Sequence, residues 1–124
     1  MLLVAQLLAG LAAAVHVYIF VLESLRWTHP STRRVFGTTA ETAETTRQLA
    51  YNQGFYNLFL AAGAVAGALL VGTDRAVGTA LLVLSVGSML AAALVLVLSD
   101  RGKVRPAVVQ GLLPALTLLL LLLA

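Results

Sequence analysis

Four long apolar stretches constrain the fold of this chain more than any other feature of its sequence. Each is close to the length that an α-helix needs to cross the hydrocarbon core of a bilayer, about 20 residues. Short segments that contain most of the charged residues separate them. A soluble domain of 124 residues, 60% of them hydrophobic, would have far more apolar surface than its core can bury. The sequence therefore predicts an integral membrane protein.

The lengths of the connections predict how the apolar stretches pack. Short connections place sequential helices side by side and antiparallel, so we expect an all-α, up-down four-helix bundle. The second helix is expected to begin near residue 39, ahead of its membrane segment, because Thr38 and Glu41 have the spacing of a capping box. The chain is predicted to be one four-span domain over residues 1–124, with spans at about 2–25, 48–71, 76–98 and 106–124.

The basic residues are distributed unevenly between the connections, which predicts the orientation of the bundle. Seven of the eight lysines and arginines lie in the first and third connections, and only Arg75 lies in the second. By the positive-inside rule, the first and third connections are expected to be cytoplasmic and both termini to lie outside. The net charge of +3 is interpreted in the same way, as a topology signal and not as a nucleic-acid-binding surface.

Polar side chains cluster in residues 51–63, YNQGFYNLFLAAG, at the start of the second span. An amide in hydrocarbon is costly unless it finds a hydrogen-bond partner. At about 100° per residue, these polar residues share one arc of the helix, which we expect to face the bundle. Comparable arcs on the first and fourth helices carry further polar residues at a similar depth. We therefore predict one ligand-binding site formed by His16, Glu23, Asn52, Gln53, Tyr56, Asn57 and Gln110.

The sequence leaves two interpretations of these polar residues open. Asn and Gln often join membrane helices by hydrogen bonds, and this alone is enough to explain Gln53 and Gln110. His16 and Glu23 are ionisable, and ionisable side chains within a membrane usually mark a functional site. Glu23 lies close to the membrane interface, however, where pairing with Arg26 would neutralise it.

Metal or hydrolase chemistry has little support in the sequence. The chain has no cysteine. His16 and Glu23 are about 10 Å apart along one helix, too far to bind one ion directly. No serine lies in the context of a hydrolase nucleophile. We expect neither a metal nor a cofactor.

The motif GAVAG at residues 63–67 has the Gly-x-x-x-Gly spacing that lets two membrane helices approach closely. We expect this face to pack against another helix, either of the same bundle or of a second copy of the chain. A homodimer through the Gly63/Gly67 face is therefore one predicted partnership. The other expected partners are the lipid bilayer and a small molecule or lipid headgroup.

Several short motifs carry a resemblance to a known family. They are His16, ESLRW at 23–27, RVFG at 34–37, NQGFYN at 52–57, QG at 110–111 and PA at 114–115. With these motifs the chain resembles domain of unknown function family 1304, which comprises small four-helix bacterial membrane proteins. The resemblance covers nearly the whole chain, and NQGFYN is its most specific part. It implies four spans in a bacterial inner membrane, and it implies no activity.

Three functions remain open at this point. The first is binding of a small polar molecule or lipid headgroup in a cytoplasm-facing site within the membrane, with proton-coupled transport as one form of it. The second is a membrane-embedded enzyme that uses His16 and Glu23 as an acid/base pair on a lipid or isoprenoid. The third is a structural or accessory subunit whose amides only hold the bundle together. We rank binding first, because alanine and glycine close the outer end of the polar arcs.

Overall fold

A computed structural model describes all residues 1–124 and contains only helices and turns. Four helices in it are long and apolar enough to cross a membrane. They confirm the predicted all-α, four-span class. In chain order the elements are α1 (Leu2–Phe20), the π-helix η1 (Val21–Leu25), α2 (Pro30–Phe36), α3 (Ala40–Thr45), α4 (Arg47–Leu70), α5 (Arg75–Ser99), the 3₁₀-helix η2 (Arg101–Lys103) and α6 (Val104–Leu123).

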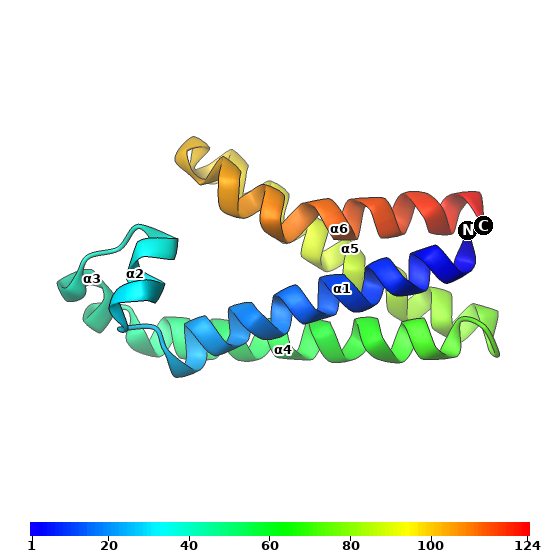
Figure 1. The fold of residues 1–124 in the computed structure, drawn as a ribbon, viewed down its shortest axis with the longest axis horizontal. Helices are drawn as coiled ribbons and strands as arrows, with labels where there is room; N and C mark the ends of the chain where they lie inside the picture. The colour runs from blue at the N-terminus through cyan, green and yellow to red at the C-terminus, as the bar shows by residue number, and fades with distance from the viewer.

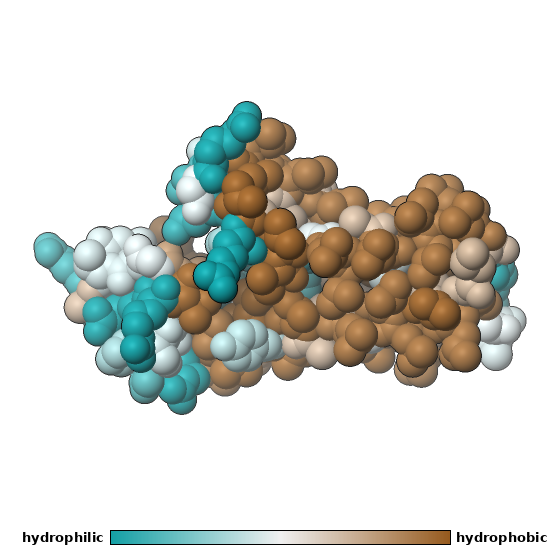
Figure 2. All heavy atoms as spheres, turned by 45° about the horizontal axis from the view of Figure 1, so that its top comes forward, coloured by the Kyte–Doolittle hydropathy of each residue, from teal (hydrophilic) through white to brown (hydrophobic).

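The long helices form a closed bundle. Each packs beside the next one in the sequence, and α6 returns to pack beside α1, so the up-down arrangement is confirmed. Both termini lie at one end of the bundle, and α2 and α3 lie at the other (Figure 1). Seven of the eight basic residues belong to the segments at that second end, which we call the basic end. Figure 2 shows hydrophilic surface gathered there, with hydrophobic surface along the helices.

Local capping interactions fix the connection at the basic end. Pro30 occupies the first position of α2, and the His29 side chain accepts a hydrogen bond from the Ser31 N–H at 3.2 Å. The helix ends at Gly37, whose φ of 65° is the left-handed conformation common at helix C-termini. The indole N–H of Trp27 donates to the Thr46 hydroxyl at 3.1 Å and ties this connection to α4.

The helix predicted to begin near residue 39 and continue into the second span is divided in two. α3 begins after Thr39, whose hydroxyl accepts a hydrogen bond from the Thr42 N–H at 3.1 Å. The cap is therefore one residue beyond Thr38, the position that the sequence predicts. The helix is interrupted at Thr46, where the hydroxyl bonds back to the Thr42 carbonyl at 2.7 Å. The same carbonyl also accepts the Thr46 N–H at 3.0 Å, so the hydroxyl adds a second bond to it. Back-bonding of this kind by threonine often bends a helix, and α4 then begins as a separate helix.

Small residues let the long helices approach one another. On α4, Gly63 lies against Ser85 of α5, and Gly67 lies against Leu82 and the Gly78 carbonyl. Membrane helices gain stability mainly from such close packing, since apolar residues gain little by leaving lipid for protein. The Gly63/Gly67 face is thus covered by α5 of the same chain. A homodimer would need a different surface from the one that the sequence suggests.

Pro114 lies inside α6 and is buried in the bundle. A proline has no N–H for the carbonyl four residues earlier, that of Gln110, and its ring pushes against that carbonyl and bends the helix. The half of α6 before Pro114 packs closely on α5, with Gly111 against Ala93. Figure 1 shows this half diverging from α1 towards the basic end. At this end the long helices enclose a cavity that Pro106 and Gln110 of α6 help to line.

Candidate functional site

A cavity of about 510 Å³ lies between the long helices near the basic end. Figure 2 shows a hollow in the surface towards this end. All four long helices contribute to its wall, together with α2 and η2. Five of the seven predicted site residues line it, along with polar groups from the basic end. Its polar lining residues are His16, Glu23, Gln53, Asn57, Ser99, Lys103 and Gln110.

His16 is almost fully buried, at 2% exposure, and presents one free nitrogen to the cavity. Its Nδ1 atom lies 2.9 Å from the Ala12 carbonyl oxygen, one turn earlier in α1. A carbonyl only accepts hydrogen bonds, so Nδ1 carries the proton in the neutral ring and Nε2 is an acceptor. No protein group bonds Nε2. The ring is therefore held in a fixed orientation and offers an unused acceptor.

Glu23 and Asn57 form a hydrogen-bonded pair between the first and second spans. The Asn57 side-chain amide donates to the Glu23 carboxylate at 2.6 Å and to the backbone carbonyl of Gln53 at 3.2 Å. The single ion pair of the protein joins Arg47 to Glu44, so Glu23 is not neutralised by Arg26. The structure therefore pairs the Glu23 carboxylate with the Asn57 amide and not with the Arg26 guanidinium.

Close packing of α4 against η1 brings this pair together. A methyl group added at Gly54 would overlap the Ser24 hydroxyl, so the two segments meet at a point where only glycine fits. The Ser24 hydroxyl donates to the Tyr51 carbonyl at 2.7 Å across the same contact. Glu23 lies inside the π-helix η1, and single π turns in membrane and soluble helices often occur at functional sites.

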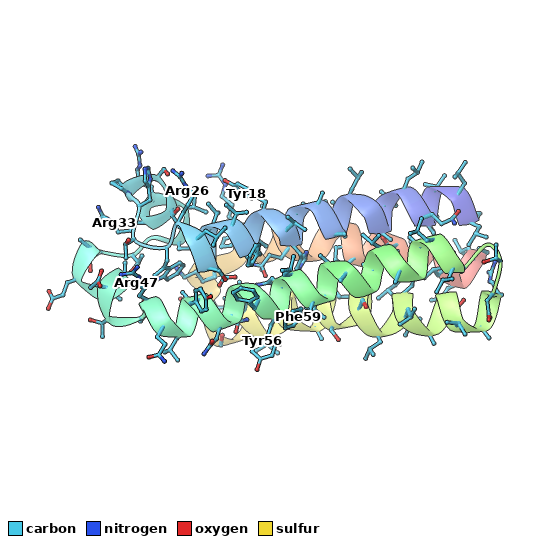
Figure 3. The ribbon with its side chains drawn as sticks, turned by 90° about the horizontal axis from the view of Figure 1, so that it is seen from below. Tyr18, Arg26, Arg33, Arg47, Tyr56 and Phe59 are labelled. Carbon is cyan, nitrogen blue, oxygen red and sulfur yellow. The ribbon has the colours of Figure 1, made fainter.

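Two predicted site residues, Asn52 and Tyr56, do not line the cavity. Tyr56 is 64% exposed, and Figure 3 shows it on the outer side of α4; Asn52 is exposed as well. The expectation that both face the bundle is wrong. The packed face of α4 is centred near Gly54, and residues two positions away from it point about 160° away at 100° per residue. The polar residues share one arc, but packing brings only its Gln53/Asn57 edge to the cavity, with Asn57 half-buried and Gln53 exposed at the rim.

Lys103 also lines the cavity, although the sequence did not predict it as a site residue. Its ammonium group donates to the Phe36 carbonyl at 2.9 Å and joins η2 to the end of α2. Both residues line the cavity, so this contact closes part of its basic end. In the sequence, Lys103 is one of several basic loop residues, and only the position of α2 distinguishes it from the others.

The amides divide into those that join helices and those that do not. Gln6 donates to the Ala68 carbonyl at 2.7 Å and so joins α1 to α4. The side chains of Gln53 and Gln110 form no hydrogen bond within the protein, although both line the cavity. Helix-joining hydrogen bonds therefore account for Gln6 and Asn57 but not for Gln53 and Gln110.

Replacing these amides by leucine separates the two roles. Asn57→Leu leaves the Glu23 carboxylate without a partner, and we expect a loss of about 1 to 3 kcal/mol in the free energy of unfolding. Gln53→Leu removes no protein hydrogen bond, so we expect a change within about 0.5 kcal/mol. Thermal unfolding in one detergent, followed by circular dichroism, measures both. Equal losses of stability in the two variants would contradict the hydrogen bond between Asn57 and Glu23.

The cavity combines groups of different hydrogen-bonding character. His16 Nε2 accepts, the Glu23 carboxylate accepts, the amides of Gln53 and Gln110 do both, and the Lys103 ammonium donates. No group of three or more His, Cys, Asp or Glu side chains comes together in the structure. The arrangement can hold a small molecule that carries both donors and acceptors.

Comparison with known proteins identifies the family. No curated protein and no solved structure matches the chain significantly. A family model described as "Protein of unknown function (DUF1304)" matches residues 10–122. The match includes every residue that lines the cavity. The chain therefore belongs to the DUF1304 family of proteins of unknown function.

Proposed function

We propose that the protein binds a small polar molecule or a lipid headgroup in the cavity at the basic end. The main support is the set of cavity groups without a protein partner, namely buried His16 Nε2 and the half-buried Gln110 amide, with the exposed Gln53 amide at the rim. Polar groups inside a membrane protein cost free energy unless something satisfies their hydrogen bonds. A bound molecule would supply those bonds.

The cavity also suggests what kind of molecule it holds. Its volume of about 510 Å³ is in the range typical of small-molecule sites. His16 and Glu23 favour a hydroxyl or amino group, because both present acceptors. Lys103, at the basic end, favours a carbonyl or anionic group. The ligand would therefore carry a donor at its inner end and an acceptor at its outer end.

We also propose that the basic end faces the cytoplasm of a bacterial cell. The positive-inside rule supports this orientation, since seven of the eight basic residues lie at that end. Figure 3 shows Arg26, Arg33 and Arg47 there. The binding site would then open to the cytoplasmic side of the plasma membrane, and both termini would lie outside.

Proton-coupled transport is the form of activity that Glu23 favours. Glu23 lines both the inner cavity and a separate outer groove of about 520 Å³, which Trp27, Arg47 and Tyr51 also line. A carboxyl group at the boundary of two spaces is positioned to pass a proton between them. Acid/base catalysis by His16 and Glu23 on a lipid or isoprenoid is the second candidate, since both line one cavity.

Native mass spectrometry of the purified protein tests the proposal. We expect a co-purifying molecule in the wild type, and its occupancy should fall at least about tenfold in His16→Leu and Gln110→Leu, since each loses one hydrogen bond to it. Asn52→Leu is the matched control, because it removes an amide from the outer side of α4. No bound molecule in protein extracted with its native lipids, or equal loss in all three variants, would contradict the proposal.

A further inference from the structure

A second hollow lies on the outside of the bundle, between α1 and α6. Its volume is about 310 Å³, and we call it the α1–α6 groove. It runs beside the cavity, separated from it by residues that line both spaces. Its wall is mostly apolar, with two arginines at the basic end. The lining residues that carry the argument are Tyr18, Leu22, Arg34, Arg105, Val109 and Gln110.

The two arginines come from elements far apart in the sequence, α2 and the start of α6. Both side chains are exposed, and neither takes part in an ion pair or a hydrogen bond within the protein. In this they differ from basic residues close to them in the sequence, which do form hydrogen bonds within the protein. Arg33 donates to the Thr28 carbonyl at 3.3 Å, and Lys103 donates to the Phe36 carbonyl. The fold thus brings to one groove two arginines whose guanidinium donors are unused.

The apolar part of the groove continues from the arginines towards the middle of the bundle. Tyr18 is 57% exposed and Val109 is 58% exposed, one on each side of the groove. Both belong to helices that are long and apolar enough to cross a membrane. In a membrane, the arginine end of the groove would lie at the level of the interface and its apolar length at the level of the acyl chains.

We propose that the α1–α6 groove binds an anionic phospholipid, with its phosphate between Arg34 and Arg105 and an acyl chain along Tyr18 and Val109. Arginine forms bidentate, charge-assisted hydrogen bonds with phosphate oxygens. Basic pockets between membrane helices bind anionic headgroups for this reason. The assignment does not depend on the proposed function, because the groove is outside the cavity and needs no ligand within it.

Titration with two lipids of identical acyl chains tests the headgroup. Native mass spectrometry in detergent would compare phosphatidylglycerol with phosphatidylcholine. We expect the anionic lipid to bind at least about tenfold more tightly, because phosphatidylcholine carries beside the same phosphate a cationic choline group that the two arginines repel. The double variant Arg34→Gln/Arg105→Gln should lose this preference. The matched double variant Arg26→Gln/Arg101→Gln removes the same charge from the same end but no groove residue, and it should keep the preference.

A further variant tests the acyl chain. Val109→Trp retains both arginines and fills the apolar part of the groove, so we expect it to weaken phosphatidylglycerol binding as well. Equal binding of the two lipids, equal loss in the two double variants, or unchanged binding by Val109→Trp would each overturn the proposal. His16→Leu removes a cavity group and no groove residue, so it should keep the preference for phosphatidylglycerol over phosphatidylcholine even where it lowers occupancy of the cavity. This separates a failure of the groove from a failure of the cavity.

Discussion

Replacing Gly78 by leucine is expected to prevent the bundle from folding stably. A Cβ atom at Gly78 would overlap the backbone of Val71, at the end of α4. Backbone atoms have no alternative rotamer, so α4 and α5 would have to separate along their shared face. We expect the free energy of unfolding to fall by more than about 1 to 3 kcal/mol, the usual cost of an overpacked side chain. The variant should aggregate in detergent or unfold at a much lower temperature than the wild type.

Gly10→Leu is the matched control for this prediction. Gly10 lies in α1, is exposed, and has nothing within 4 Å of the place where its Cβ would be. A leucine there would face lipid, so we expect stability within about 0.5 kcal/mol of the wild type. Size-exclusion chromatography and thermal unfolding by circular dichroism measure both variants. If Gly78→Leu unfolds at the same temperature as the wild type, α4 and α5 do not approach as closely as described.

Asn57→Asp is expected to make the stability of the bundle strongly dependent on pH. It would replace a hydrogen-bonded amide, 2.6 Å from the Glu23 carboxylate, by a second carboxylate. At low pH the two carboxyl groups can share a proton and remain bonded. As the pH rises and that proton is lost, two like charges remain together at a half-buried position. We expect the loss of stability to be largest at neutral pH and above, with the about 3 to 5 kcal/mol of an uncompensated, fully buried charge as its upper limit.

Thermal unfolding between acidic and alkaline pH measures this effect. The sign is fixed by charge: Asn57→Asp should be most stable at acidic pH and lose stability as the pH increases. Asn57→Leu serves as the control, since it removes the hydrogen bond without adding a charge. If the two variants show the same pH dependence, Glu23 and residue 57 are not in contact. Agreement with the prediction would place a carboxylate pair at the wall of the cavity.

The two proposed sites share a wall, and this arrangement has a functional consequence. Gln110 lines both the cavity and the α1–α6 groove. A phospholipid in the groove would therefore lie directly beside the polar site. If the cavity holds a lipid headgroup, the groove is the side from which a membrane-borne ligand would approach it. If it holds a small polar molecule, the lipid would form part of the wall.

Residue type predicted much of the lining of the cavity. The two wrong residues, Asn52 and Tyr56, were misplaced for one reason. His16, Glu23, Gln53, Asn57 and Gln110 are polar residues at positions where hydrocarbon is expected, and all five line the cavity. The helical arc that contains them was also visible. Which edge of that arc faces inward was not, because the orientation of α4 is set by where its small residues pack, above all at Gly54.

The sequence by itself determined the class of this protein. Apolar length and composition predict four helices that are long and apolar enough to cross a membrane, short connections predict an up-down order, and the basic residues define one end of the bundle. These properties depend only on local length, hydropathy and charge. They hold whatever the detailed packing of the helices is.

Only the tertiary structure decided which side chains meet. It paired Glu23 with Asn57 and not with Arg26, brought Lys103 to the Phe36 carbonyl, and placed Arg34 and Arg105 at one groove. Each contact joins residues that are distant in the sequence. Their distances depend on helix rotation, on the π turn of η1 and on the bend at Pro114, which arise from close packing between helices. Sequence periodicity specifies the faces of a helix, whereas packing selects the face that points inward.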